Sequence, residues 1–524
     1  MSTTSYWQQF QNSTTRYPEL NFSIDTSRMD IPVDYKSGLN LEINRAFEGI
    51  KKIEAGEIMN PDEGRMVGHY WLRNAGLAPN EEIRKQITDP LATLKDFAHK
   101  ISSGLLTNPK GGRFENLLII GIGGSALGPQ FIYESLGSRS PLKTYFFDNT
   151  DPAGIDTTLA DISNTQAGLS KTLSVVISKS GGTPETRNGM LEAVVAYEAL
   201  GLNFGDHAVA VTGTNSKLSN YASENNFIIT FPMEDWVGGR SSIMSTVGLV
   251  PAALQGVDID AFLGGAADMD ERTRSENVEG NAAMQLALAW HHAGNGKGDK
   301  DMVVLPYKDS MVLFSKYLQQ LVMESLGKEK DLNGKVVNQG IAVYGNKGST
   351  DQHAYVQQLR DGVPNFFTIF IEVRKGREGE SSEVEPNVTA ADYLQGFLRG
   401  TRTALYENGR KSITLSIEEV NARTVGALIA LFERAVSIYA LLVNINAYHQ
   451  PGVEAGKKAA GIFLALLLQV KSALGESAQT AEQVARFVRA DPEDVYHCLT
   501  HLAANGYASL NQGATPALDT FQLP

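Results

Sequence analysis

The 524-residue sequence has almost no cysteine and a deficit of positive charge. Its single cysteine, Cys498, excludes an intramolecular disulfide framework and fits a reducing compartment such as the cytoplasm. Lys and Arg number 46 against 59 Asp and Glu, and the net charge of -13 argues against a broad surface for nucleic acid. A local basic pocket for a small anion is compatible with this balance.

Long uncharged apolar runs are also missing. The longest apolar helical candidate, residues 425–443, carries Glu433 and Arg434 at its centre, so we expect a buried helix and no membrane span. The N-terminus has glutamines at residues 8, 9 and 11 in place of a basic start and an apolar core, so no signal peptide is predicted. No His, Cys and carboxylate cluster has metal-ligand spacing, so no metal is expected.

Alternating strand-like and helix-like segments predict an α/β protein with two doubly wound parallel sheets. Short apolar runs mark a first series of strands at 116–121, 143–148, 173–178, 208–212 and 226–231. A second series lies at 302–306, 341–344, 366–373 and 412–416. Because the chain is too long for a single core, we expect two large domains with additional segments, four segments in all. These are 1–105, an irregular arm followed by helices; 106–290 and 291–471, the two α/β domains; and 472–524, a helical tail.

The sequence pattern of the tail, residues 472–524, predicts a small helix-turn-helix or winged-helix unit. Thr480 and Gln483 form a capping box, a second helix begins after Asp491, and Gly506 ends it. That second helix carries acids and no Lys or Arg, which is a poor surface for phosphates. We therefore expect the tail to serve assembly or stability and to bind no nucleic acid, which also disfavours a sugar-phosphate-sensing regulator.

Two glycine-rich loops each follow a predicted strand and favour an anion. Residues 121–129 read GIGGSALGP, and residues 178–186 read SKSGGTPET. Thr183 is a natural N-cap before Pro184, so hydroxyl and backbone N–H groups converge at a helix N-terminus, where phosphate binds. The first loop also fits a dinucleotide fingerprint, with Asp148 after the next strand. A dehydrogenase does not need the hydroxyl-rich second loop, so a phosphosugar site is favoured.

Two side chains further along suit proton transfer. Glu324 lies three residues after Leu321 and seven after Tyr317, so its carboxylate leaves from an apolar helix face. Periodicity alone favours a structural acid paired with a nearby lysine, and a general base is the alternative. His353 stands where a loop gives way to a helix, either as a capping group or as a proton carrier.

Two other segments carry a cation. Gly238 and Gly239 would let the backbone approach a ligand while Arg240 stands beside it as a fixed charge, although a plain turn has the same composition. Residues 450–457 end in Lys457 and could equally be a helix start with an exposed lysine.

Together these segments resemble the glucose-6-phosphate isomerase (phosphoglucose isomerase) family, of bacterial type. The matching stretches run in family order: 121–129, 148–152, 178–186, 235–242, 323–328, 348–353 and 450–457. The resemblance implies two flavodoxin-like sugar isomerase (SIS) domains in a cytoplasmic homodimer with shared active sites. It also implies an aldose–ketose isomerase of glycolysis and gluconeogenesis that interconverts glucose 6-phosphate and fructose 6-phosphate. The reaction opens the ring, passes through a cis-enediolate and needs no cofactor.

The resemblance also assigns roles to individual residues. Glu324 becomes the base that moves a proton between sugar carbons, while His353 and Lys457 open the ring. Glu185 orients the histidine, which in the family comes from the neighbouring subunit. The reacting atoms are lined by Gly239, Arg240 and Gln450. The phosphate lies on Gly124, Ser125, Ser178, Lys179 through its backbone, Ser180, Thr183 and Thr186.

The sequence departs from the family pattern in three places. Ser180 replaces the commoner threonine, and Leu326 replaces the commoner asparagine before Gly327. Residues 472–524 are not the usual C-terminal hook, so the resemblance leaves the role of the tail open.

Overall fold

The computed structural model describes residues 5–524, without the side chains of residues 453–455, and divides into two compact units, Met1–His449 and Gln450–Pro524. The first four residues of the predicted arm lie outside the described residues. The boundary between the units falls within the predicted 291–471 domain. The predicted division of the chain into four segments stays a prediction.

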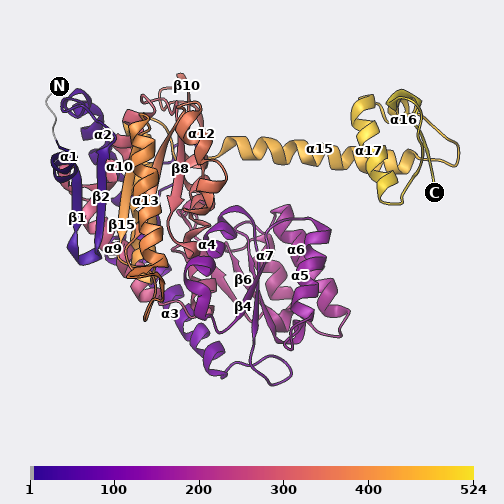
Figure 1. The fold of residues 1–524 in the computed structure, drawn as a ribbon. Helices are drawn as coiled ribbons and strands as arrows, with labels where there is room; N and C mark the ends of the chain where they lie inside the picture. The colour runs from indigo at the N-terminus through magenta and orange to yellow at the C-terminus, as the bar shows by residue number, and fades with distance from the viewer. Residues whose placement is uncertain (1–4) are drawn as a thin grey trace. The chain divides into compact units, whose positions relative to one another are not determined.

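The first unit contains a five-stranded parallel sheet of order β4-β3-β5-β6-β7 (Figure 1). Its strands confirm the first predicted series: β3 (Asn116–Ile120), β4 (Lys143–Phe147), β5 (Thr172–Ile177), β6 (Ala208–Thr212) and β7 (Ile229–Pro232). Alternate side chains of β3 enter two cores, Leu117 and Ile119 on one face and Leu118 and Ile120 on the other. One core includes α3 (Glu81–Ser103), α4 (Leu127–Leu136) and α8 (Thr246–Leu254); the other includes α5 (Pro152–Ser163), α6 (Pro184–Glu198) and α7 (Lys217–Glu224). The doubly wound arrangement is confirmed.

The second sheet has six strands in the order β1-β2-β15-β12-β8-β11. Its parallel strands confirm the second predicted series: β8 (Asp301–Pro306), β11 (Val343–Tyr344), β12 (Phe366–Val373) and β15 (Ser412–Ile417). The prediction of an irregular arm is wrong, because β1 (Thr14–Tyr17) and β2 (Phe22–Arg28) form an antiparallel hairpin at the edge. Ile24 is fully buried opposite Leu415. So short a hairpin is marginal by itself, and the rest of the sheet stabilises it.

The apolar helix α14 (Ala422–Leu442) lies in the core of the first unit, against α2 (Asn40–Glu54), α9 (Ile259–Thr273) and α10 (Ala282–Ala293). Of the helices in the described part of the chain, it alone is long and apolar enough to cross a membrane, and 94% of its apolar window is buried inside the structure. Arg434 Nε and Arg73 Nε each donate to the Asp270 carboxylate at 2.7 Å, and Arg73 also pairs with Glu433. This buried ion cluster accommodates the two charges within the helix.

The segment between β8 and β11 changes its helical form. It starts as α11 (Phe314–Leu318), continues as the π-helix η12 (Gln319–Glu324), and leads into the hairpin of β9 (Lys328–Lys330) and β10 (Val336–Gln339). The expectation of a regular α-helix around Glu324 is therefore wrong over Gln319–Glu324, which form the π-helix. The remaining helices and strands of this unit are α1 (Tyr6–Asn12), α12 (Val356–Asp361), β13 (Glu383–Glu385), β14 (Val388–Thr389) and the long α13 (Ala390–Glu407).

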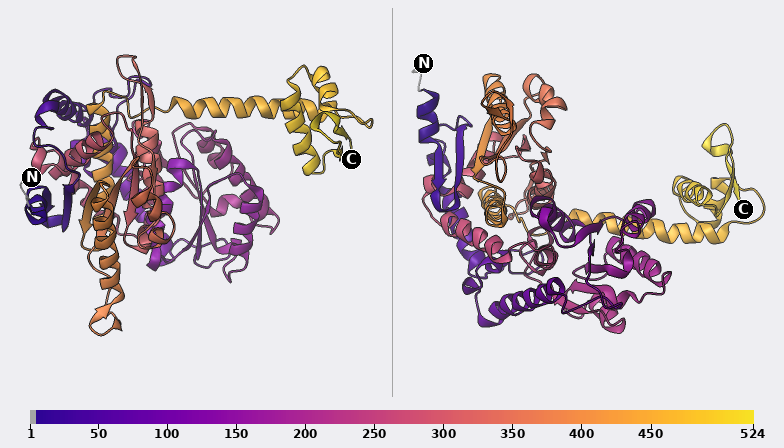
Figure 2. Two further views of the ribbon diagram at one scale, coloured as in Figure 1. Left: turned by 45° about the horizontal axis from the view of Figure 1, so that its top comes forward. Right: turned by 60° about the horizontal axis from the view of Figure 1, so that its bottom comes forward.

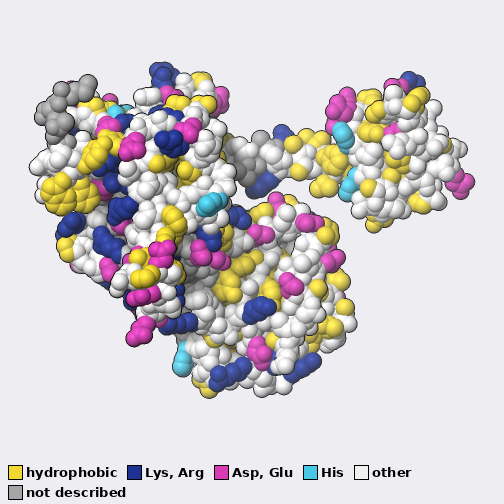
Figure 3. Space-filling view, viewed as in Figure 1, with side chains coloured by type: hydrophobic (Ala, Val, Ile, Leu, Met, Phe, Trp, Pro, Cys, Tyr) yellow, Lys and Arg dark blue, Asp and Glu magenta, His cyan; other side chains and the backbone are white. Residues whose placement is uncertain are grey.

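The second unit is a long helix followed by a small winged-helix-like fold (Figure 2). It consists of α15 (Pro451–Ala473), α16 (Ala481–Val488), α17 (Pro492–Ala504) and a hairpin of β16 (Ser509–Asn511) with β17 (Thr520–Gln522). The predicted capping box of Thr480 and Gln483 is present, and Cys498 is buried in the unit's own core. On the face seen in Figure 3, basic side chains of the first unit lie among acidic ones.

Candidate active site

The two predicted anion loops meet at one edge of the five-stranded sheet. They follow β3 and β5, which are hydrogen-bonded neighbours and parallel, so both loops leave from the same end. From β3 the chain passes to β4 on one side and then to β5 on the other. This reversal creates a topological switch point, where open α/β sheets bind their ligands.

The first loop packs against protein backbone rather than leaving space for a dinucleotide. A Cβ atom at Gly124 would lie 2.0 Å from the carbonyl oxygen of Gly239. A Cβ atom at Gly123, where φ is +58°, would lie 3.3 Å from Gln320 Nε2. The hypothesis of a dinucleotide site also needs a carboxylate at Asp148 for the ribose, but this carboxylate accepts a 2.7 Å hydrogen bond from Gln130. The glycines therefore bring this loop against the segments that carry Arg240 and Glu324.

The second loop presents several hydroxyl groups at the N-terminus of α6. Thr183 is the N-cap residue, but its side chain makes no capping bond, so the hydroxyl is not engaged with the helix. Ser178 Oγ accepts from Gly181 N at 3.2 Å, and Ser180 Oγ accepts from Gly182 N at 3.1 Å. Each serine hydroxyl keeps its own proton to donate to an anion. The loop and the helix N-terminus together suit a phosphate.

Lys179 helps to hold this second loop in place. The Lys179 ammonium donates to the carbonyl oxygens of Asp235 at 3.1 Å and Val237 at 3.2 Å, so its side chain ties the loop to the segment before Arg240. Thr186 is buried at 3% exposure in the first turn of α6. Ser125, at the end of the 3-10 turn Gly123–Ser125, lies in the other loop and is partly exposed.

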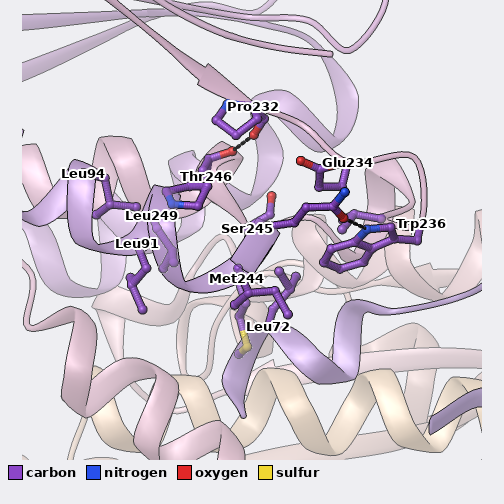
Figure 4. A pocket seen from close by; sticks show the side chains of 14 residues that line it. Leu72, Leu91, Leu94, Pro232, Glu234, Trp236, Met244, Ser245, Thr246 and Leu249 are labelled. Carbon is purple, nitrogen blue, oxygen red and sulfur yellow. Dashed lines mark hydrogen bonds between the residues drawn. The ribbon is translucent and has the colours of Figure 1, made fainter. Parts of the chain in front are cut away.

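The segment before Arg240 is anchored by Trp236 in the core (Figure 4). Its indole Nε1 donates to Gln86 on α3 at 2.9 Å. The small cavity beside it, about 30 Å³, is lined by residues of α3 and α8, among them Leu94 and Leu249. This volume holds about two waters and no sugar phosphate. The cavity is therefore part of the scaffold.

Glu324 and Arg240 form an ion pair within the candidate site. Arg240 Nε lies 3.3 Å from Glu324 Oε2, with the arginine side chain 5% and the glutamate side chain 23% exposed. Gln320 also donates to Glu324 Oε2 at 3.2 Å. The alternative of a glutamate paired with a lysine is wrong in its partner, because Lys328 donates to the backbone carbonyl of Glu324 and not to the carboxylate.

The Arg240 guanidinium is held by two further carbonyl groups. It donates to Ala447 O at 3.1 Å and to His449 O at 3.5 Å. Burial lowers the pKa of Arg240, and the nearby Glu324 and Glu63 oppose this shift. Since an arginine stays protonated in proteins, the site contains a fixed, buried cation.

His353 and Glu185 are on separate elements of the first unit. His353 ends the 3-10 helix Thr350–His353 and is exposed. Glu185 lies in the first turn of α6, and its Oε2 is buried without a hydrogen-bond partner among the described residues. No hydrogen bond joins these two side chains within the described chain, so the orienting role of Glu185 stays a prediction.

Gln450 and Lys457 belong to the second unit. Gln450 is the N-cap residue of α15, and Lys457 lies on the same helix. Their predicted roles beside Glu324 stay predictions.

Sequence reasoning missed two features around the ion pair. Lys328 is a buried lysine at the start of β9, and its spacing of four residues from Glu324, the last residue of the π-helix, is a signal that pointed to it. The turn at residues 60–65 lies near the same charges, since Glu63 acts electrostatically on Arg240 and Asp62 on Lys328. This turn shows no sequence pattern that indicates a site.

An anion loop at the switch point of a doubly wound sheet, with a carboxylate–arginine pair beside it, defines the phosphosugar isomerase class. A crystal structure of a glucose-6-phosphate isomerase from Chlamydia trachomatis has the same fold, with a TM-score of 0.79, 24% identity and coverage of 88% of this chain and 91% of that one. The family model described as phosphoglucose isomerase matches residues 39–481. The chain belongs to this family and is an isomerase.

Relatives in sequence agree over nearly the full length. The glucose-6-phosphate isomerase of Thermosynechococcus vestitus is 57% identical over 99% of this chain and 98% of its own. The glucose-6-phosphate isomerase of Citrifermentans bemidjiense is 55% identical over 95% of each chain. The family resemblance predicted from the sequence is confirmed.

Proposed function

We propose that this protein interconverts glucose 6-phosphate and fructose 6-phosphate. The observation that carries the proposal is the Glu324–Arg240 pair, a carboxylate 3.3 Å from a buried cation and beside the glycine loop. Membership of the family adds the substrate, because the relatives carry the name glucose-6-phosphate isomerase.

Substrate binding begins at the phosphate. The hydroxyl groups of Ser178, Ser180 and Thr183 donate to the phosphate oxygens at the N-terminus of α6, where the helix dipole favours negative charge. Ser125 and the backbone of Gly124 complete this binding site from the first loop. The phosphate anchors the sugar and leaves its carbons to the Glu324–Arg240 pair.

Ring opening comes next and needs a proton at the ring oxygen and a base at the C1 hydroxyl. His353 and Lys457 carry out these transfers, with Glu185 orienting the imidazole and Gln450 lining the sugar. In a homodimer with shared sites, the histidine comes from the neighbouring subunit. This arrangement fits the exposure of His353 on the surface of the first unit.

Isomerisation then proceeds on the open chain. The Glu324 carboxylate removes the proton from C2, and the electron pair moves to the carbonyl oxygen at C1 to give a cis-enediolate. Arg240 stabilises this negative charge, and a preorganised cation of this kind is typically worth about 3–4 kcal/mol in the transition state. The proton of the C2 hydroxyl passes to the C1 oxygen, Glu324 returns its own proton to C1, and C2 becomes the carbonyl carbon of the ketose. The reaction serves glycolysis and gluconeogenesis in the cytoplasm and consumes no cofactor.

The test is an isomerase assay on the purified protein. Fructose 6-phosphate is supplied, and glucose 6-phosphate is measured by coupling to its dehydrogenase. We expect turnover without added metal or nucleotide cofactor in the isomerase step, tested by preincubation with a chelator. A protein that folds and binds fructose 6-phosphate but does not convert it would refute the proposal.

A further inference from the structure

A buried lysine, Lys328, contacts the backbone of the proposed general base, Glu324. Lys328 is the first residue of β9 and is only 5% exposed, whereas Lys330, two residues further on the same strand, is exposed. Lysine is almost never buried without a partner, because its ammonium group loses hydration there. The position of its charge therefore requires an explanation.

The partner of the Lys328 ammonium is the backbone of Glu324. Nζ donates to the carbonyl oxygen of Glu324 at 2.7 Å. Carbonyl groups at the end of a helix lack partners within the helix, and a lysine there supplies one. The carboxylate of the same residue meets Arg240, so one glutamate is fixed at two points by two cations. A π-helix within an α-helix is rare and is frequently found at functional sites.

Four charged or titratable groups face this ammonium from separate elements. Arg240 is a cation, His449 carries an imidazole, and Glu324 and Asp62 are acids. Burial and the repulsion from Arg240 lower the pKa of Lys328 to about 8, against the opposing effect of the two acids. An ordinary lysine stays charged beyond pH 10. The charge on Lys328 is therefore lost within a range in which the enzyme can be assayed.

We propose that Lys328 is a positioning residue for the isomerisation: its ammonium fixes the end of the π-helix that carries Glu324 and adds a second positive charge behind the Glu324–Arg240 pair. The inference rests on the proposed function. The charged form of Lys328 holds the Glu324 carboxylate beside the substrate carbons and stabilises the negatively charged enediolate. When the lysine loses its proton, both effects weaken.

The test compares Lys328→Met, Lys328→Gln and Lys328→Arg, with Lys330→Met as the matched control on the same strand. In wild type, kcat/KM for fructose 6-phosphate should fall on the alkaline side with a midpoint near pH 8, since this quantity reports groups of the free enzyme. Lys328→Met should lower kcat by about tenfold or more, with KM little changed, because a hydrogen bond from a charged group is lost. It should also abolish the alkaline limb.

The other variants separate charge from folding. Lys328→Arg should recover most of the activity and move the alkaline limb to higher pH, and Lys330→Met should behave as wild type. If Lys328→Met does not fold, Lys328→Gln and Lys328→Arg decide the matter through their pH profiles. An alkaline limb at the wild-type pH in any folded Lys328 variant, or wild-type kcat in Lys328→Met, would overturn the inference. Absence of isomerase activity in wild type would instead refute the proposed function.

Discussion

The substitution Glu324→Gln tests the chemistry with little change of shape. The amide has the size of the carboxylate, and its oxygen can still accept hydrogen bonds from Arg240 and Gln320. It has no basic lone pair with which to take a proton from carbon. Loss of a general base costs about 10²–10⁴-fold in rate, so we expect kcat to fall by this factor while substrate binding persists.

The structural cost of the same substitution is expected to be small. Arg240 keeps its hydrogen bonds to the carbonyl oxygens of Ala447 and His449. Removing one partner of a fully buried pair costs about 3–5 kcal/mol, but Glu324 retains 23% of its side-chain exposure, so we expect about 1–2 kcal/mol here. Thermal unfolding of the variant beside wild type measures this difference.

Two assays check the prediction. The coupled conversion of fructose 6-phosphate gives kcat and KM, and exchange of solvent tritium into C2 of the sugar reports proton transfer directly. Glu329→Gln, at an exposed position on β9, is the matched control and should behave as wild type. Tritium exchange at nearly the wild-type rate in Glu324→Gln would show that another group is the base.

Three further predictions concern the phosphate loop, the buried ion cluster and the division of the site between chains. Thr183→Val should raise KM for the sugar phosphate and weaken competition by inorganic phosphate in steady-state kinetics; unchanged values would place the phosphate elsewhere. Asp270→Asn removes the carboxylate shared by Arg73 and Arg434, so the free energy of unfolding in denaturant should fall by about 3–5 kcal/mol, and an unchanged midpoint would contradict this. Co-refolding Glu324→Gln with His353→Ala should restore roughly a quarter of wild-type activity, because about half of random dimers are mixed and each has one intact site. No recovery despite demonstrated subunit exchange would argue against a shared site.

The sequence determined those features that depend on neighbouring residues. The central strands of both parallel series, β3, β5, β12 and β15 among them, are short apolar runs buried on both faces, and burial from both sides makes such runs recognisable. The capping box of Thr480 and Gln483 is equally local. The two anion loops also follow from their glycines, hydroxyls and the Thr183–Pro184 helix start, which act over a few residues.

Only the tertiary structure decided which distant groups meet. The strand order places the loops after β3 and β5 side by side, and the backbone contact of Gly124 with Gly239 brings in Arg240. Arg240 then becomes the partner of Glu324, although periodicity alone favoured a lysine.

The π-helix, the β1–β2 hairpin and the bond from Lys328 to the Glu324 carbonyl have the same origin. Each is stabilised by packing or pairing that arises only when the chain has folded. Local sequence preferences amount to less than about 1 kcal/mol per residue, and long-range contacts can override them.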